Sequence, residues 1–110
     1  MALRRLCYAR SGDKGDTSNI GVLARSPRIY EWLAGYLTAA RVKKYFGPMV
    51  KGPVTRHRLD NLEGFNFLLE GALGGGGTTS LLVDPQGKTL SQALLQMEVQ
   101  VPSSLLRGLD

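Results

Sequence analysis

The sequence predicts one α+β domain, with a mostly antiparallel sheet and helices packed on one face of it. Its 110 residues fit a single domain. The contents of 43% hydrophobic and 21% charged residues are ordinary for a globular protein. Segments with strand periodicity mix with helical segments without strict βαβ alternation, which favours an α+β arrangement. We find no repeat or linker, and therefore expect a domain over residues 1–102 and a loose C-terminal tail over 103–110.

Two strands are expected near the N-terminus. Leu3–Arg10 alternates apolar and polar residues, and Asn19–Arg25 is a second extended segment. Gly21 inside the second segment indicates a bulge or a close approach to the backbone. Between them, Ser11–Ser18 carries two glycines and is predicted to be a polar loop.

Two helices should follow these strands. Ser26 is a typical N-cap residue, and Pro27 suits the first helical position. Thr38 can cap the second helix, which Gly47 and Pro48 should end.

The second half of the chain contains one ambiguous segment. Residues 61–73 fit both a strand and a helix, and we expect a short helix because Asn61 can cap it and Gly74 can end it. The other predicted elements are strands over 53–59, 78–83 and 98–101, a turn over 84–87 and a helix over 89–97. This order matches a ferredoxin-like α/β plait with an added N-terminal strand.

The composition restricts the cellular setting and the chemistry. Cys7 is the only cysteine, so an intrachain disulfide is excluded and a reducing compartment is expected. The sequence shows neither a signal peptide nor an apolar run of about 20 residues that could span a membrane, so we expect a cytoplasmic protein. One cysteine and one histidine, His57, do not make a zinc site, and no metal or cofactor is predicted.

Charge is distributed unevenly along the chain. Residues 1–58 carry a net +9, and residues 59–110 a net −4, within a total of +5. The asymmetry indicates either a surface for nucleic acid or an acidic ligand, or two halves that face each other in the fold or across an oligomer interface. We favour the second interpretation because the basic residues are dispersed, and the aromatic motif of an RNA-binding plait is missing.

The segment Arg10–Asn19 is the first candidate site. Its glycines let backbone N–H groups turn toward an anion, its basic side chains can bind a carboxylate or phosphate, and its aspartates can act as general bases. A solvated connection in which Asp and Gly serve turn geometry is the alternative. The candidate catalytic residues are Asp13, Lys14 and Asp16, and the candidate ligand-binding residues are Arg10, Ser11, Gly12, Gly15 and Asn19.

A run of four glycines is the second candidate site. Gly74, Gly75, Gly76 and Gly77, followed by Thr78, leave the backbone open to a ligand or another chain. A flexible hinge or a helix stop explains them equally well. Neither a Walker A loop nor a Rossmann fingerprint is present. If both candidate loops meet at one end of the sheet, they form a single anion pocket.

Several motifs in order resemble the AtuA-like family, named for acyclic terpene utilisation. The resemblance covers about residues 6–102 and is carried by Ser11–Asp16, Asn19–Arg25, Leu37–Phe46, Phe65–Leu69, Ala72–Gly77 and Gly87–Leu95. It implies the C-terminal ferredoxin-fold domain of larger proteins linked to citronellol and geraniol breakdown, standing here without their large N-terminal domain. It brings no agreed catalytic residues.

Two functional hypotheses remain. The first is an accessory module, a homo-oligomer that binds a small anionic acyl or terpenoid carboxylate, or its coenzyme A thioester, and acts with a larger subunit. The second is a small lyase, hydratase or isomerase in which Asp13 or Asp16 is the base and Lys14 and Arg10 stabilise negative charge.

Overall fold

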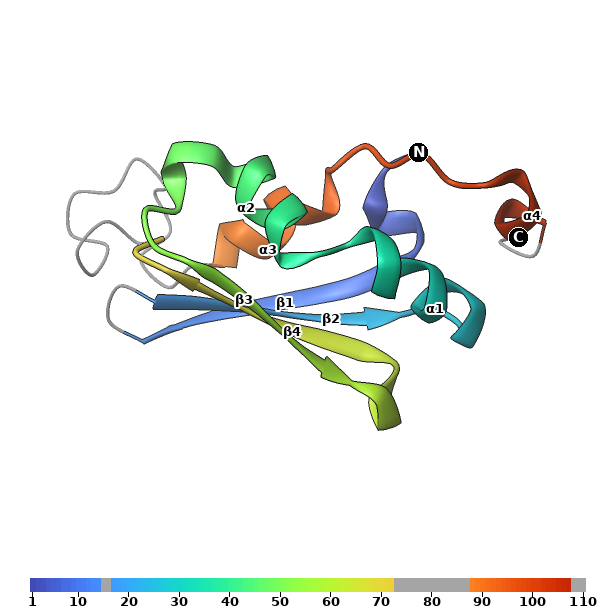
Figure 1. Cartoon of the computed structure of the whole chain (residues 1–110), viewed down its shortest axis with the longest axis horizontal. Helices are drawn as coiled ribbons and strands as arrows, with labels where there is room; N and C mark the ends of the chain where they lie inside the picture. The colour runs from blue at the N-terminus through green and yellow to red at the C-terminus, as the bar shows by residue number, and fades with distance from the viewer. Residues whose placement is uncertain (15–16, 73–87, 108–110) are drawn as a thin grey trace.

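The computed structural model describes residues 1–14, 17–72 and 88–107. Its helices lie together on one side of a four-stranded sheet (Figure 1). The strands are β1 (Cys7–Lys14), β2 (Thr17–Ala24), β3 (Val54–Leu59) and β4 (Gly64–Glu70). The helices are α1 (Pro27–Tyr36), α2 (Ala39–Phe46), α3 (Lys88–Leu95) and α4 (Ser103–Leu106), with 3-10 turns η1 (Leu3–Arg5), η2 (Gly47–Met49) and η3 (Asp60–Leu62). The α+β class and the one-sided helical layer are confirmed.

The sheet order is β1-β2-β4-β3, and each neighbouring pair is antiparallel. Two hairpins build it: β1 with β2, and β3 with β4. The strands β2 and β4, which come from different hairpins, pair in the centre. The segment that carries α1 and α2 connects the hairpins and crosses one face of the sheet (Figure 1).

Alternation along the central strands separates the two faces. Ile20 and Val22 of β2 are fully buried, as are Phe65, Phe67 and Leu69 of β4. These side chains form one hydrophobic core with Leu33 of α1, Leu90 and Leu94 of α3, and Leu37 between α1 and α2. The alternate residues of the same strands lie on the opposite face, which no described helix covers (Figure 1).

The predicted helix ends are confirmed. The Ser26 hydroxyl accepts a hydrogen bond from the Ile29 amide at 3.2 Å, and the Thr38 hydroxyl accepts one from the Arg41 amide at 3.1 Å. Gly47 ends α2 with φ +60°, a conformation that glycine adopts without a Cβ penalty.

The helix expected over residues 61–73 is wrong. Residues 64–70 form the strand β4, because a partner strand lies on each side of it and alternation buries all of its aromatic residues. Gly64 also lies against β2, where a Cβ would come within 2.4 Å of the Val22 carbonyl oxygen. Tertiary pairing thus overrides a local pattern that fitted both structures.

The polar loop expected over residues 11–18 is also wrong for most of its length. β1 continues to Lys14 and β2 begins at Thr17, so this segment is the end of a hairpin. The pairing of β1 with β2 continues through this segment, with Ser11 opposite Ile20 and Gly12 opposite Asn19.

Both ends of the chain differ from the simple strand predictions. Residues 3–5 form η1, whose spacing of three places Leu3 and Leu6 in the core together. The strand expected over 98–101 is reduced to an isolated bridge between Glu98 and Ala2. Residues 103–106, expected in a loose tail, form α4 with Leu105 largely buried. The strand predicted over 78–83 and the turn over 84–87 lie outside the described residues.

Candidate ligand-binding site

A row of four residues crosses the uncovered face of the sheet. Arg10 of β1 pairs with Gly21 of β2, Gly21 with Asn66 of β4, and Asn66 with His57 of β3. Neighbouring strands lie about 4.8 Å apart, so Arg10 and Asn66 flank Gly21 at one strand spacing on each side. Three polar side chains therefore share one row with a position that has no side chain.

Gly21 opens a hollow in this face. A Cβ at this position would meet only the Arg10 carbonyl oxygen, at 3.9 Å, so the space above the backbone is empty. The hollow has a volume of about 190 Å³. It is lined by Tyr8, Ala9, Arg10, Gly21, Val22, Leu23, Leu59 and Phe65. Arg10 is the only charged residue in this lining, so the hollow is an apolar site with one guanidinium group.

Large apolar side chains border the hollow and remain open to solvent. Tyr8 is 57% exposed and Leu23 is 45% exposed. Tyr8 is held by Arg25, which donates to its hydroxyl at 2.7 Å and lies 4.1 Å from its ring centroid. The same guanidinium donates to the Arg4 carbonyl oxygen at 3.1 Å. This side of the hollow is thus preorganised by a cation–π contact and hydrogen bonds.

A second hollow continues along β2 on the same face. Its volume is about 300 Å³, and it is lined by Thr17, Ser18, Asn19, Asn66 and Leu68. Asn19 Nδ2 donates to Asn66 Oδ1 at 3.1 Å across it. One apolar and one polar hollow therefore lie in line along a single strand.

The predicted site residues divide between the two faces of the hairpin. Arg10, Gly12 and Asn19 share the uncovered face, whereas Ser11 belongs to the alternate set and pairs with Ile20 on the helix side. Gly12 is closely packed: a Cβ there would lie 3.2 Å from Asn19 Oδ1. Its carbonyl oxygen also accepts a hydrogen bond from the Ser18 hydroxyl at 2.9 Å.

The remaining predicted residues are described only in part or not at all. In the backbone ladder, Asp13 pairs with Ser18 and Lys14 with Thr17, but the side chains of Asp13 and Lys14 lie outside the described structure. The residues Gly15, Asp16, Gly74, Gly75, Gly76, Gly77 and Thr78 also lie outside it.

Tyr8, Asn66 and His57 are the members of this surface that the sequence reasoning missed. Tyr8 and Arg10 are two residues apart in a predicted strand, and this spacing is the signal that puts both side chains on one face. Asn66 lay in a segment expected to be helical, so its face was not assignable. Gly21, expected to mark a bulge or a close approach to the backbone, pairs in unbroken register with Arg10 and Asn66 and opens the hollow.

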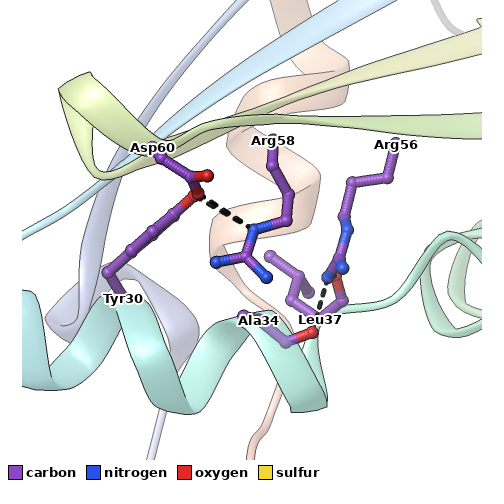
Figure 2. A network of polar contacts seen from close by, with 6 residues as sticks. All are labelled: Tyr30, Ala34, Leu37, Arg56, Arg58 and Asp60. Carbon is purple, nitrogen blue, oxygen red and sulfur yellow. Dashed lines mark hydrogen bonds and ion pairs between the residues drawn. The ribbon is translucent and has the colours of Figure 1, made fainter.

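A second polar cluster lies on the helix side of β3 (Figure 2). The Tyr30 hydroxyl donates to Asp60 Oδ1 at 2.5 Å, and Arg58 Nε donates to the same oxygen at 3.1 Å. The Tyr30 hydrogen bond holds the pKa of the Asp60 carboxyl below its usual value, and the charge of Arg58 acts in the same direction. The cluster joins the end of β3 to α1.

Many of the basic side chains serve the fold itself. Lys43 donates to the carbonyl oxygens of Val50 and Gly52, and Arg28 donates to that of Ser104. Arg41 donates to the Tyr36 carbonyl oxygen at 2.7 Å. These internal contacts agree with the dispersed placement of the positive charge.

The other candidate groups give no site in the described part of the chain. Burial raises the pKa of the Cys7 thiol to about 12, while the positive charge of Arg25 acts in the opposite direction. Cys7 is a free, buried cysteine, and a buried thiol of raised pKa is a poor nucleophile at neutral pH. No cluster of three potential metal ligands occurs among the described residues. Within the same residues, no helix has both the length and the apolar character needed to cross a membrane.

Comparison with known proteins identifies the family of this chain. No curated protein and no solved structure shows significant similarity to the chain. The family model for the AtuA ferredoxin-like domain matches residues 1–100, nearly all of the chain. The chain therefore belongs to the family of AtuA ferredoxin-like domains.

Proposed function

We propose that the chain is a small ligand-binding accessory domain, which takes an acyl or terpenoid carboxylate, or its thioester, on the uncovered face of the sheet. The observation that carries this proposal is the apolar hollow over Gly21 with Arg10 in its lining. A solvated antiparallel sheet face normally carries polar residues, whereas this one exposes Tyr8 and Leu23 around a depression. An exposed apolar depression of this kind is typical of a binding surface.

The size of the hollow limits the apolar part of the ligand. An apolar cavity of about 150 Å³ holds one benzene ring. At about 190 Å³, the hollow suits a group of roughly six to eight carbons, such as a medium-length acyl chain or a branched isoprenoid tail. Burial of such a tail is favourable by about 0.8 kcal/mol per methylene group.

Arg10 is the proposed partner of the anionic end. Its side chain is exposed and makes no ion pair with any described residue. A guanidinium group can bind a carboxylate with two parallel hydrogen bonds. An amphipathic anion can therefore place its tail in the hollow against Tyr8 and Leu23, and its head group at Arg10.

Action with a larger subunit is the second part of the proposal, and family membership supports it. In this arrangement residues 1–102 form the domain, which itself self-associates. Co-purification with a subunit that carries the larger AtuA-like domain, identified by mass spectrometry, tests the partnership. Size-exclusion chromatography with light scattering tests self-association.

Ligand binding is tested by NMR titration of the full chain with octanoate. Wild-type protein should show saturable shifts centred on Tyr8, Gly21 and Leu23, and Gly21→Val should weaken binding at least ~10-fold because its side chain occupies the hollow. The nearest atom to the new Cβ is 3.9 Å away, so this variant should fold. Gly35→Ala on α1, where no atom lies within 4 Å of the new Cβ, is the matched control. Equal affinity of Gly21→Val and wild type would contradict the proposed site.

A further inference from the structure

One end of the Asn66 side-chain amide has a hydrogen-bond partner. Its Oδ1 accepts the hydrogen bond from Asn19 Nδ2 at 3.1 Å. An Asn side chain has an acceptor oxygen and a donor NH2 group. Asn19 engages the oxygen of this amide, and in the hydrogen bonds among the described residues the NH2 group of Asn66 is not a donor. We therefore take the NH2 group as the end that is offered to a ligand.

This donor shares a row with Arg10. Both residues are cross-strand partners of Gly21, from β1 on one side and from β4 on the other. Arg10 lines the hollow over Gly21, and Asn66 lines the second hollow next to it. Arg10 has donors only, and the NH2 group of Asn66 is also a donor, so the two residues on either side of Gly21 can both donate to a ligand. Two donors on either side of a bare glycine match an oxygen acceptor placed between them.

We propose that Asn66 is a head-group-binding residue, whose NH2 group donates to the acyl oxygen of a ligand that lies over Gly21, and that Asn19 is a positioning residue that sets the Asn66 amide. This inference rests on the proposed function and adds the recognition of the head group. The recognised group is an acyl oxygen, which a carboxylate and a thioester share. A carboxylate uses Arg10 and Asn66 together, whereas an uncharged thioester depends mainly on Asn66.

The orientation of Asn66 depends on the donor of Asn19. In Asn19→Asp, the new carboxylate can only accept a hydrogen bond. Asn66 then has to rotate its amide and donate to Asp, which turns its Oδ1 toward the ligand. Two oxygens would face each other, and the preference for an acyl oxygen over a hydroxyl should fall.

The test compares three ligands of equal chain length on the full-length protein. Octanoate, the octanoyl thioester of N-acetylcysteamine, and octan-1-ol are titrated separately and followed by amide chemical shifts. Asn66→Asp is expected to weaken the binding of octanoate and of the thioester at least ~10-fold, and that of octan-1-ol less than ~3-fold. Arg10→Gln should weaken the binding of octanoate by a similar factor and leave the affinity for the thioester within ~3-fold of wild type. This difference distinguishes a carboxylate from a thioester as the source of the acyl oxygen.

Controls separate head-group recognition from charge and from folding. Asn61→Asp introduces the same charge on the exposed turn η3 and should leave all three affinities unchanged. Asn66→Ser carries no charge, and should weaken the thioester at least ~5-fold while preserving the dispersed spectrum of a folded protein. Asn19→Asp should lower the ratio of octanoate to octan-1-ol affinity at least ~5-fold, a selectivity change that simple loosening of the sheet does not produce.

The possible failures are distinguishable. If wild type binds octanoate in the hollow but folded Asn66→Asp and Asn66→Ser bind octanoate and the thioester as wild type does, the inference is overturned and the proposed function stands. An unchanged selectivity ratio in Asn19→Asp removes the positioning role of that residue. If wild type binds none of the three ligands, the proposed function fails, and this inference fails with it.

Discussion

Arg56 Nη1 donates to the carbonyl oxygen of Leu37 at 3.0 Å, so a side chain from β3 closes the C-terminal end of α1 (Figure 2). The same nitrogen donates to the Ala34 carbonyl oxygen at 2.9 Å. The last carbonyl groups of a helix have no partner within the helix, and a cation there also interacts favourably with the helix dipole. This contact fastens the helical layer to the edge of the sheet.

Arg56→Met should therefore destabilise the protein by about 1.5–3 kcal/mol, since hydrogen bonds from a charged donor are lost while the aliphatic packing is largely retained. Urea unfolding followed by the fluorescence of Trp32, the only tryptophan, measures the change. Arg58→Met is the matched control, because its ion pair with Asp60 is exposed to solvent and should contribute little to stability. Equal losses in both variants would contradict the capping role.

Two glycine substitutions should act in opposite directions. In Gly64→Ala the new Cβ would lie 2.4 Å from the Val22 carbonyl oxygen, so the central β2–β4 pair has to separate and the loss should exceed ~2 kcal/mol. In Gly35→Ala on α1 the Cβ meets no atom within 4 Å, and the gain should reach up to about 1 kcal/mol. Thermal unfolding of both variants and of wild type measures the two changes in stability. A neutral Gly64→Ala would indicate that β2 and β4 pack less closely than described.

Cys7 should make stability depend on alkaline pH. Its folded pKa of about 12 exceeds the usual thiol value of 9.0, because the buried thiol stays neutral. Above pH 9 the unfolded chain loses this proton first, so the contribution is complete below pH 9 and declines as the pH rises toward 12. The slope is at most about 1.4 kcal/mol per pH unit.

Urea unfolding of wild type and Cys7→Ala at pH 8, 9 and 10 tests this dependence. The stability advantage of wild type should shrink with increasing pH, since the alanine variant lacks the titrating thiol. A constant difference between the two proteins over this range would argue that the thiol is accessible to solvent.

Asp60 should contribute to stability at neutral pH and lose that contribution in acid. Its folded pKa lies below the usual value of 3.8, chiefly because the Tyr30 hydroxyl donates to it. The contribution is present above pH 3.8 and disappears as the pH falls through the lower, folded value. Tyr30→Phe removes the donor and should move the Asp60 titration upward, which carboxyl carbon NMR can follow. An unshifted titration in this variant would show that Arg58 alone sets the Asp60 pKa.

Local signals predicted the helical layer well. Ser26, Thr38 and Gly47 act within one turn of the chain, so their roles as two N-caps and a helix stop are readable from neighbouring residues. Family membership was also readable, because motifs along nearly the whole chain occur in the expected order.

The candidate surface was only partly predictable. Arg10, Gly12 and Asn19 were identified from the density of polar residues in the hairpin, and they do share one face. Strand alternation separates Ser11 from them, because β1 continues where the sequence predicts a loop. Asn66 is not among the predicted residues, since a helical prediction for its segment hides the period-two pattern on which its face depends.

The sequence by itself determined the α+β class, the positions of the helix caps, and the family. Only the tertiary structure decided that residues 64–70 form a strand, and that this strand lies between β2 and β3. The physical reason is that Phe65, Phe67 and Leu69 can be buried by either local conformation, so the choice depends on backbone partners that are distant in sequence. The same pairing brings Arg10, Gly21 and Asn66 into one row from three separate strands, and no local pattern contains that register.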